Sequence, residues 1–507
     1  MQAAYKIIKN TGILYAKMGI TMFISLYSTR LILDALGVSD YGIFNLVAGV
    51  IAMLSFLNSA MTVSTQRYMS FHLGAGEFNK LNEVFRSSVI LHLIIGICIV
   101  IFLEVAGLFL FNGILNMPNN RIGTAKIIYH FMVVSTFFTI NAVPYDAILN
   151  SHENMLFESI VGIVESVFKL IIAVWIIYSK EDKLILFGLL TAGLTILIRI
   201  IKSRYCSNKY AECKFTLNKR VNFNLLKEML FFAGWNLFGA LCSLGKTQGL
   251  AIVFNIFLGP IINAAYGIAN QVSGQLSTFS QIMLQAINPQ IMKSEGANER
   301  QRMMRLSMTA SKFGFFLLAF IAIPCIYEMP FLLKFWLKEV PNYTIQFCSW
   351  VLIAMMINQM TAGLDSAIQA SGNIKLYMLI VGTLKLLIVP LGYLMMKIGF
   401  PVIYVIIGYA AIETIAGIAR MIILKIKLKL SIRKYLKYLT TGMLFPIIAT
   451  NFYLFIITTY LNFDYRFLFT ISSSVVVFFI SIYFGGLNNE EKLFIKSFYL
   501  RIYNRIL

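Results

Sequence analysis

The stretch TGILYAKMGITMFISLYSTRLILDAL, residues 11–36, decides the fold class of this chain. An α-helix needs roughly 20 apolar residues to cross a bilayer, and this stretch is longer than that. It contains only three charged residues, Lys17, Arg30 and Asp34. The short basic segment before it, MQAAYKIIKN, is not followed by a small-residue cleavage site. The stretch is therefore predicted to be a retained first helix rather than a signal peptide.

The remainder of the chain has the same apolar character. Of its 507 residues, 59% are hydrophobic and 13% are charged, whereas soluble domains have about 25% charged residues. This composition excludes an ordinary cytosolic enzyme and a disordered or fibrous protein, and it predicts an all-α polytopic membrane protein. The six cysteines occur singly and the four histidines do not cluster with them. No metal site and no disulfide framework is therefore expected.

Fourteen apolar stretches are long enough to be transmembrane helices. Pro144, Pro324 and Pro390 fall inside three of them and predict kinks. The predicted segments are 11–36, 41–70, 85–112, 122–150, 154–179, 183–205, 225–258, 260–292, 303–335, 343–371, 374–397, 400–425, 437–461 and 465–487.

The basic residues predict the orientation of these helices. The formal net charge is +21, from 43 Lys and Arg against 22 Asp and Glu. With the N-terminus in the cytoplasm, 29 basic residues fall on the cytoplasmic side and eight on the other side. This bias satisfies the positive-inside rule and predicts that both termini are cytoplasmic.

Helices 1–6 and 7–12 are predicted to be an internal duplication. The exit of helix 2, QRYMSFHLGAGEFNKLNEVFRSS, resembles that of helix 8, PQIMKSEGANERQRMMRLS, and both carry a Gly/Ala element followed by a polar stretch. The other matches, at offsets of 219–225, pair Tyr41-Gly42 with Tyr266-Gly267, DAILNSHEN (146–154) with DSAIQASGN (365–373), and Val161-Gly162 with Val381-Gly382. Two parallel halves of this kind are typical of transporters whose substrate site lies between the halves.

The repeat predicts the domain organisation. The chain divides into an N-terminal six-helix lobe (1–205), a cytoplasmic linker (206–224), a C-terminal six-helix lobe (225–425), a basic connection (426–436), two additional helices (437–487) and a cytoplasmic tail (488–507).

Six basic residues remain within predicted helices, where a cation costs about 2.5–3.5 kcal/mol at the bilayer centre. Arg67 lies near a helix end, where a snorkelling role is expected. Lys169 follows Glu165 by four residues, so a helical ion pair and a cavity role both remain open. Lys385 has no acid four residues before it. The better cavity candidates are Lys17, Arg30 and Lys246, on the equivalent helices 1 and 7.

A polar stripe on helix 8 adds Asn270, Gln271 and Gln275 to these candidates. Amides and hydroxyls recognise sugars, so we expect the stripe to line a cavity, with interhelical hydrogen bonding as the alternative. A cationic cavity suits an anionic substrate, since a phosphate in a low-dielectric site needs fixed positive partners. Among the intramembrane acids, Asp34 and Glu165 are the candidates for coupling transport to a proton or sodium ion, because each has a basic neighbour.

The segment STRLILDALGVSDYGIFNLVAG (28–49), the QRYMSFHLGAGE exit and the two-times-six repeat resemble the polysaccharide transporter (Wzx-type) branch of the MOP superfamily. That superfamily also contains the MATE exporters and the lipid II flippases. The resemblance spans residues 1–425, and helices 13 and 14 match its fourteen-helix members. It implies two lobes in a V, alternating access, and flipping of undecaprenyl-diphosphate-linked oligosaccharide across the bacterial cytoplasmic membrane. In related lipid II flippases basic cavity residues bind the diphosphate, and Arg30 and Lys246 fall on comparable helices.

Two rival functions compete with this interpretation. The first is a MATE-type ion-coupled multidrug antiporter, against which the basic character of the unpaired cavity candidates argues. The second is a membrane enzyme acting on the same lipid, but the sequence contains no long outer loop, carboxylate pair or nucleophile constellation. We therefore expect no enzyme activity, no catalytic residue and no cofactor beyond a coupling H+ or Na+. The expected partners are the lipid-linked oligosaccharide, membrane lipids and other polysaccharide-assembly membrane proteins, with no nucleic acid.

Overall fold

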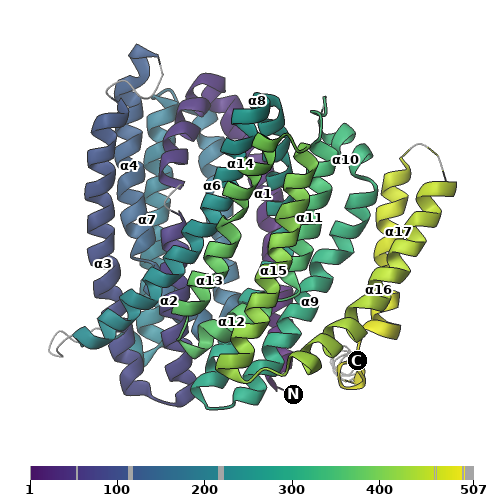
Figure 1. The fold of residues 1–507 in the computed structure, drawn as a ribbon. Helices are drawn as coiled ribbons and strands as arrows, with labels where there is room; N and C mark the ends of the chain where they lie inside the picture. The colour runs from purple at the N-terminus through teal and green to yellow at the C-terminus, as the bar shows by residue number, and fades with distance from the viewer. Residues whose placement is uncertain are drawn as a thin grey trace, which may run out of the picture. The chain divides into compact units, whose positions relative to one another are not determined.

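A computed structural model describes residues 2–52, 55–111, 118–214, 222–337, 339–461, 463, 465–493 and 496. The described residues form helices and connecting turns, without a strand (Figure 1). Much of the predicted linker and tail (215–221, 494–495 and 497–507) lies outside them. The helices are α1 (Gln2–Ala52), α2 (Ser55–Ala75), α3 (Phe78–Phe109), α4 (Ile122–Ile140), α5 (Val143–Ser151), α6 (Met155–Tyr178), α7 (Lys183–Lys209), α8 (Phe223–Gly296), α9 (Arg300–Tyr327), α10 (Met329–Trp336), α11 (Thr344–Gln359), α12 (Ala362–Ser371), α13 (Lys375–Leu386), α14 (Ile388–Ile398), α15 (Val402–Leu428), α16 (Ile432–Tyr460) and α17 (Arg466–Ser481).

The structure confirms a polytopic all-α membrane fold. In the described part of the chain, eleven helices are long and apolar enough to cross a membrane, or twelve if the bent pair α11–α12 is one span. The sequence predicts fourteen segments because its pattern divides α1 and α8 into two each. Both helices are broken by a glycine, at Gly37 and Gly259. Helix α8 contains both predicted segments 225–258 and 260–292, whereas the predicted segment 41–70 falls on the end of α1 and on most of α2.

The two breaks have the same backbone conformation. Gly37 has φ 77° and ψ 165°, and Gly259 has φ 78° and ψ −174°. Only glycine adopts this region readily, because a Cβ would collide with the backbone there. The two glycines are 222 residues apart, within the range of offsets that the sequence repeat predicts. Each repeat therefore has its first two predicted segments joined by a glycine of the same conformation.

The other predicted kinks also coincide with helix ends. Pro144 lies in the first turn of α5, just after the end of α4. Pro324 lies in the last turn of α9, and Pro390 follows the break between α13 and α14. Proline cannot donate a helix hydrogen bond, which explains why the helices end close to these positions.

Contacts divide the chain into two compact units. The N-terminal unit comprises Lys6–Leu237 and Met292–Asn298. The C-terminal unit comprises Phe238–Ile291 and Glu299–Leu507, with residues 1–5. Helix α8 therefore begins in the N-terminal unit, contributes its central part to the C-terminal unit and ends in the N-terminal unit.

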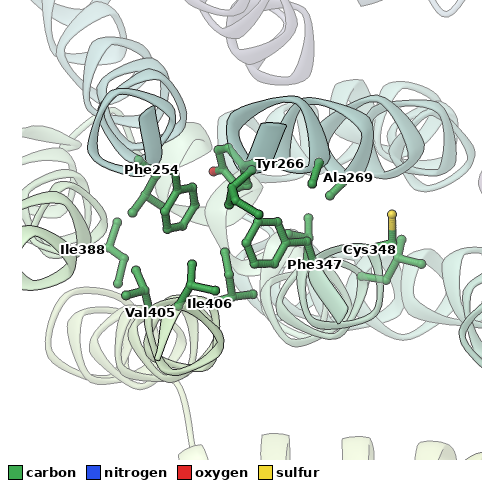
Figure 2. Close-up of a cluster of buried hydrophobic side chains, with 14 of the residues drawn as sticks. Phe254, Tyr266, Ala269, Phe347, Cys348, Ile388, Val405 and Ile406 are labelled. Carbon is green, nitrogen blue, oxygen red and sulfur yellow. The ribbon is translucent and has the colours of Figure 1, made fainter. Parts of the chain in front are cut away.

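Each unit has its own apolar core next to the glycine break. In the N-terminal unit, Tyr41 packs against a cluster that includes Leu36, Ile43 and Ile128. In the C-terminal unit, Tyr266 is buried against Phe254 and Phe347, with ring centroids 5.1 and 6.3 Å away (Figure 2). The Tyr-Gly motif of each repeat thus packs its tyrosine against the core of its own unit, with Tyr266 fully buried and Tyr41 partly buried.

Helices α16 and α17 are anchored to α9 within the C-terminal unit. Arg466 donates to both carboxylate oxygens of the buried Glu328, at 3.1 and 3.2 Å. The buried Lys312 donates to Glu491 Oε2 at 2.6 Å. The first contact is made by Glu328 at the end of α9 and the second by Lys312 on α9. Together they fix the additional pair of helices to this unit.

Candidate functional site

The C-terminal unit contains a buried charged cluster built around Glu413. Lys246 on α8 donates to Glu413 Oε1 on α15 at 2.9 Å and to the hydroxyl of Tyr409 at 3.0 Å. Lys385 on α13 lies 3.4 Å from Glu413 Oε2. The side chain of Glu413 is 2% exposed and that of Lys246 is 9% exposed. One carboxylate thus pairs with two lysines on two different helices.

Glycines on α8 bring these helices together. A Cβ built on Gly245 would lie 3.0 Å from Leu386, and one on Gly249 would lie 2.6 Å from Val389. The CSLGKTQG patch therefore allows α13 and α14 to pack closely against α8, as glycines do in other membrane helices. Lys246 lies between the two glycines and reaches α15.

Arg420 extends the cluster by two turns of α15. Its Nε donates to Tyr377 at 3.0 Å, its Nη1 to Thr361 at 2.6 Å and its Nη2 to Asn358 Oδ1 at 3.3 Å. Asn358 Oδ1 also accepts from Lys385 at 3.3 Å. Arg420 is one of the 29 basic residues predicted to be cytoplasmic, but it is buried in the structure, with 4% exposure. A count of basic residues cannot distinguish a buried arginine near a helix end from an exposed one.

The cluster carries more positive than negative charge. Its cations are Lys246, Lys385 and Arg420. Its acids are Glu413 and Asp365, which acts electrostatically on Arg420. Within the described residues the balance is therefore one surplus positive charge. A buried cation without a counter-charge is costly, so the cluster has an electrostatic preference for an anion nearby.

In the N-terminal unit, Lys17 packs on α6. A Cβ built on Gly162 would lie 2.6 Å from Lys17 Cε and 3.2 Å from its Nζ. The repeat-equivalent Gly382 has Cys242 in the same role, with Sγ 3.2 Å from a built Cβ. One turn along α6, Glu165 accepts from Lys169 at 2.7 Å, so the helical ion pair left open by the sequence is formed.

The remaining candidates on α1 are exposed. Arg30 and Asp34 lie within two turns of the break at Gly37 and both side chains are accessible. No ion pair joins these two described residues, although their spacing favours one. They are therefore separate charged groups on α1.

The polar stripe of α8 is also accessible. Gln271 and Gln275 are exposed and Asn270 is half-buried. The serines of the stripe donate to their own helix, Ser273 to Asn270 O at 3.0 Å and Ser277 to Gly274 O at 2.8 Å. Further along α8, Asn288 Oδ1 accepts from Ser366 on α12 at 2.7 Å. The cavity role of the amides and the interhelical alternative both stay predictions.

Two further arginines, Arg67 and Arg121, make contacts that the sequence does not predict. Arg67 does not snorkel but is buried, with its guanidinium 4.6 and 4.8 Å from the ring centroids of Tyr68 and Phe71.

Arg121 binds two acids, Asp40, which follows the break in α1, and Asp182, which is the N-cap of α7 and lies 2.6 Å away. Burial opposes ionisation of Asp182, but the backbone N–H groups of α7 and Arg121 outweigh it and lower its pKa. The sequence carries no signal for this pairing, because Arg121 and Asp182 are 61 residues apart.

Comparison with known proteins gives the same fold. The MatE family model matches residues 15–175. A crystal structure of a MATE mutant has a TM-score of 0.74 at 15% identity, covering 84% of this chain and 96% of that chain. An outward-facing multidrug resistance MATE family transporter of the MOP superfamily has a TM-score of 0.73 at 14% identity, covering 84% and 95%.

A third similar structure is a MOP superfamily transporter from Pyrococcus furiosus Vc1, with a TM-score of 0.72 at 14% identity and the same coverage of 84% and 95%. It is described as having a binding pocket of reverse polarity that suggests a different function. No curated protein matches the chain. The chain is therefore a multi-pass membrane protein with the fold of the MATE transporters of the MOP superfamily, and its residues 15–175 match the MatE family model.

Proposed function

We propose that this protein is a membrane transporter that works by alternating access and carries an anionic, amphipathic cargo. The cargo class that fits best is an undecaprenyl-diphosphate-linked oligosaccharide, as in the Wzx-type branch of the superfamily. The observation that carries the choice of cargo is the surplus positive charge of the cluster formed by Lys246, Lys385, Glu413 and Arg420. The MATE fold supports the transport mechanism.

The sign of the buried charge argues for an anion. The cluster already carries one positive charge without a counter-charge. An organic cation bound near it would add another positive charge and be repelled. A diphosphate would instead neutralise it and accept hydrogen bonds from lysine and arginine. Lys17 and Arg30 in the N-terminal unit, with the amides of Asn270, Gln271 and Gln275, remain the proposed contacts for diphosphate and sugar.

An ion-coupled multidrug antiporter is the second candidate. The comparisons fit this candidate better than the flippase, since the family model and the similar structures are those of MATE transporters, one of them a multidrug resistance transporter. Asp34 favours it as well, because it is an exposed acid on α1 that forms no ion pair with Arg30. In either case Asp34 and Glu165 are the proposed coupling acids, with H+ or Na+ as the coupling ion. The charge bias supports an orientation with both termini in the cytoplasm. The bacterial cytoplasmic membrane is the location that the resemblance to the Wzx-type branch implies.

Ligand-dependent stabilisation of the purified protein separates the candidates. An undecaprenyl-diphosphate oligosaccharide is expected to raise the unfolding temperature of the wild type, because a ligand that binds only the native state stabilises it. Tetraphenylphosphonium, an organic cation, is expected to leave it unchanged. Lys385→Met should weaken the effect of the lipid, and Lys169→Met, which alters an exposed pair, should not. Stabilisation by the cation alone would support the antiporter instead.

A further inference from the structure

Helix α1 carries two aromatic and two charged side chains on one narrow face. Phe23 and Tyr27 are 80% and 57% exposed, and Arg30 and Asp34 are exposed as well. The backbone is helical across this segment, which ends before the break at Gly37. Because an α-helix has 3.6 residues per turn, the four residues fall within about one sixth of its circumference. They form a single line of side chains, which we call the α1 strip.

The charged members of the strip indicate what surrounds it. The strip lies within an apolar membrane span, Tyr5–Gly49. Neither Arg30 nor Asp34 forms an ion pair or a hydrogen bond through its side chain with another described residue. Charged side chains within a membrane span are costly in hydrocarbon and face the protein interior or water. Since both are exposed, this face of α1 contacts water, and the two aromatic rings on it do so too.

The equivalent face of α8 in the second repeat lacks these side chains. The residues 222 positions after the four of the strip are two glycines and two isoleucines, Gly245, Gly249, Ile252 and Ile256. The glycines allow α13 and α14 to pack closely against α8. The aromatic and charged side chains of the strip are therefore not required by the helix packing that the repeat shares.

The chemistry of the strip suits an uncharged sugar. Phe23 and Tyr27 make no ring contact with another described residue, so a ligand that covers the rings removes apolar surface from water. The ring faces are partially negative and attract the C–H groups on the face of a sugar ring. Arg30 can donate to sugar hydroxyls, and Asp34 can accept from them. The two charges cancel, and Arg30 repels an organic cation that approaches the rings.

We propose that the α1 strip binds uncharged sugar residues of the cargo, with Phe23 and Tyr27 packed against the sugar rings and Arg30 and Asp34 hydrogen-bonded to the hydroxyls. This inference rests on the proposed function, because a sugar reaches a membrane span only as part of a transported molecule. The strip recognises the sugar and not the diphosphate. Its aromatic residues should therefore affect the binding of glycosylated lipid alone.

A comparison of two lipids that differ only in their sugar tests the proposal. The probes are undecaprenyl diphosphate carrying N,N′-diacetylchitobiose, a neutral disaccharide, and undecaprenyl diphosphate alone. Equilibrium binding to the purified full chain is measured in detergent. The wild type should bind the glycosylated lipid roughly tenfold more tightly or better, since two ring contacts contribute.

Variants of the two aromatic residues should remove this difference. Phe23→Leu and Tyr27→Leu should each weaken binding of the glycosylated lipid about three- to tenfold, because leucine is apolar but has no ring face. Binding of the sugar-free lipid should not change. Tyr27→Phe keeps the ring and should retain most of the affinity.

Phe102→Leu and Tyr178→Leu are the matched controls. Both aromatic side chains are exposed in the N-terminal unit, at 61% and 81%, but they lie on α3 and α6. Neither variant should alter the binding of either lipid. A loss of glycosylated-lipid binding in the controls as large as in the strip variants would overturn a specific role of the strip.

The remaining outcomes separate this proposal from the proposed function. Equal affinity of the wild type for both lipids, or a sugar-dependent affinity that both leucine variants retain, would overturn the sugar site and leave diphosphate recognition intact. Binding of neither lipid would contradict the proposed function, and the sugar site with it. If Phe23→Leu and Tyr27→Leu weaken binding of tetraphenylphosphonium and not of the glycosylated lipid, the strip binds organic cations, which overturns the proposal in favour of the antiporter.

Discussion

At the scale of single residues, Glu413 is the position on which the buried cluster depends. Replacing it with Gln leaves Lys246 and Lys385 buried without an acid, and losing one partner of a buried pair costs about 3–5 kcal/mol. Glu413→Gln should therefore lower the thermal unfolding temperature in detergent substantially. Lys385→Met should have little effect or raise it, because it removes the surplus cation. Equal destabilisation by both would contradict the charge balance assigned to the cluster.

The sequence identifies one member of this cluster and misses its partners. Lys246 stands out in the sequence because it has no acid nearby along α8, and the structure pairs it with Glu413, 167 residues later. Lys385 also lacks an acid four residues before it, and Arg420 is among the residues predicted to be cytoplasmic, but spacing along the sequence cannot show that α13 and α15 meet α8 there. The pair Glu165–Lys169 is predictable because both residues lie on one helix.

Asp182 should confer a pH dependence on the N-terminal unit. Because its folded pKa is lowered, its contribution to stability is complete above its ordinary pKa and is lost as the pH falls through the lowered value. The stability difference between the wild type and Asp182→Asn should therefore be constant near neutral pH and vanish in strong acid. Asn keeps the N-cap of α7, so this comparison isolates the charge. A difference that grows on acidification would refute the assignment.

At the scale of elements, the lengths of the apolar stretches predict most of the helices. They do not reveal that α1 and α8 each continue beyond a break at a glycine. Gly37→Ala and Gly259→Ala should each cost about 1–3 kcal/mol, since alanine is strained in that backbone region. The neighbouring Gly42→Ala and Gly267→Ala serve as controls, because a Cβ meets no atom within 4 Å at either and neither has a positive φ. Thermal unfolding of the four variants checks this, and similar losses in all four would argue against a special role for the breaks.

The two additional helices should depend on α9 for their position. Arg466→Met leaves the carboxylate of Glu328 buried without its partner, so the contact between α17 and α9 should loosen. Hydrogen exchange of residues 466–481 should rise in this variant, while exchange in α3 stays unchanged. If hydrogen exchange in α17 is as slow in Arg466→Met as in the wild type, the ion pair does not anchor α17.

At the scale of the whole molecule, composition and the sequence repeat predict a polytopic helical fold with two related halves, and the fold and the paired glycine breaks agree with that. The charge bias predicts the orientation of these helices in the membrane. The identity of the cargo is the least accessible from sequence, because it depends on a charge balance between helices far apart in the chain.

The measurement that tests the central claim most directly is translocation between leaflets. The purified chain is reconstituted with an undecaprenyl-diphosphate-linked oligosaccharide, and the accessibility of the lipid to a membrane-impermeant reagent is followed over time. We predict protein-dependent translocation of this lipid that slows in Lys385→Met and not in Lys80→Met, which alters an exposed ion pair outside the cluster. Absence of translocation, together with export of an organic cation by the same vesicles, would contradict the account.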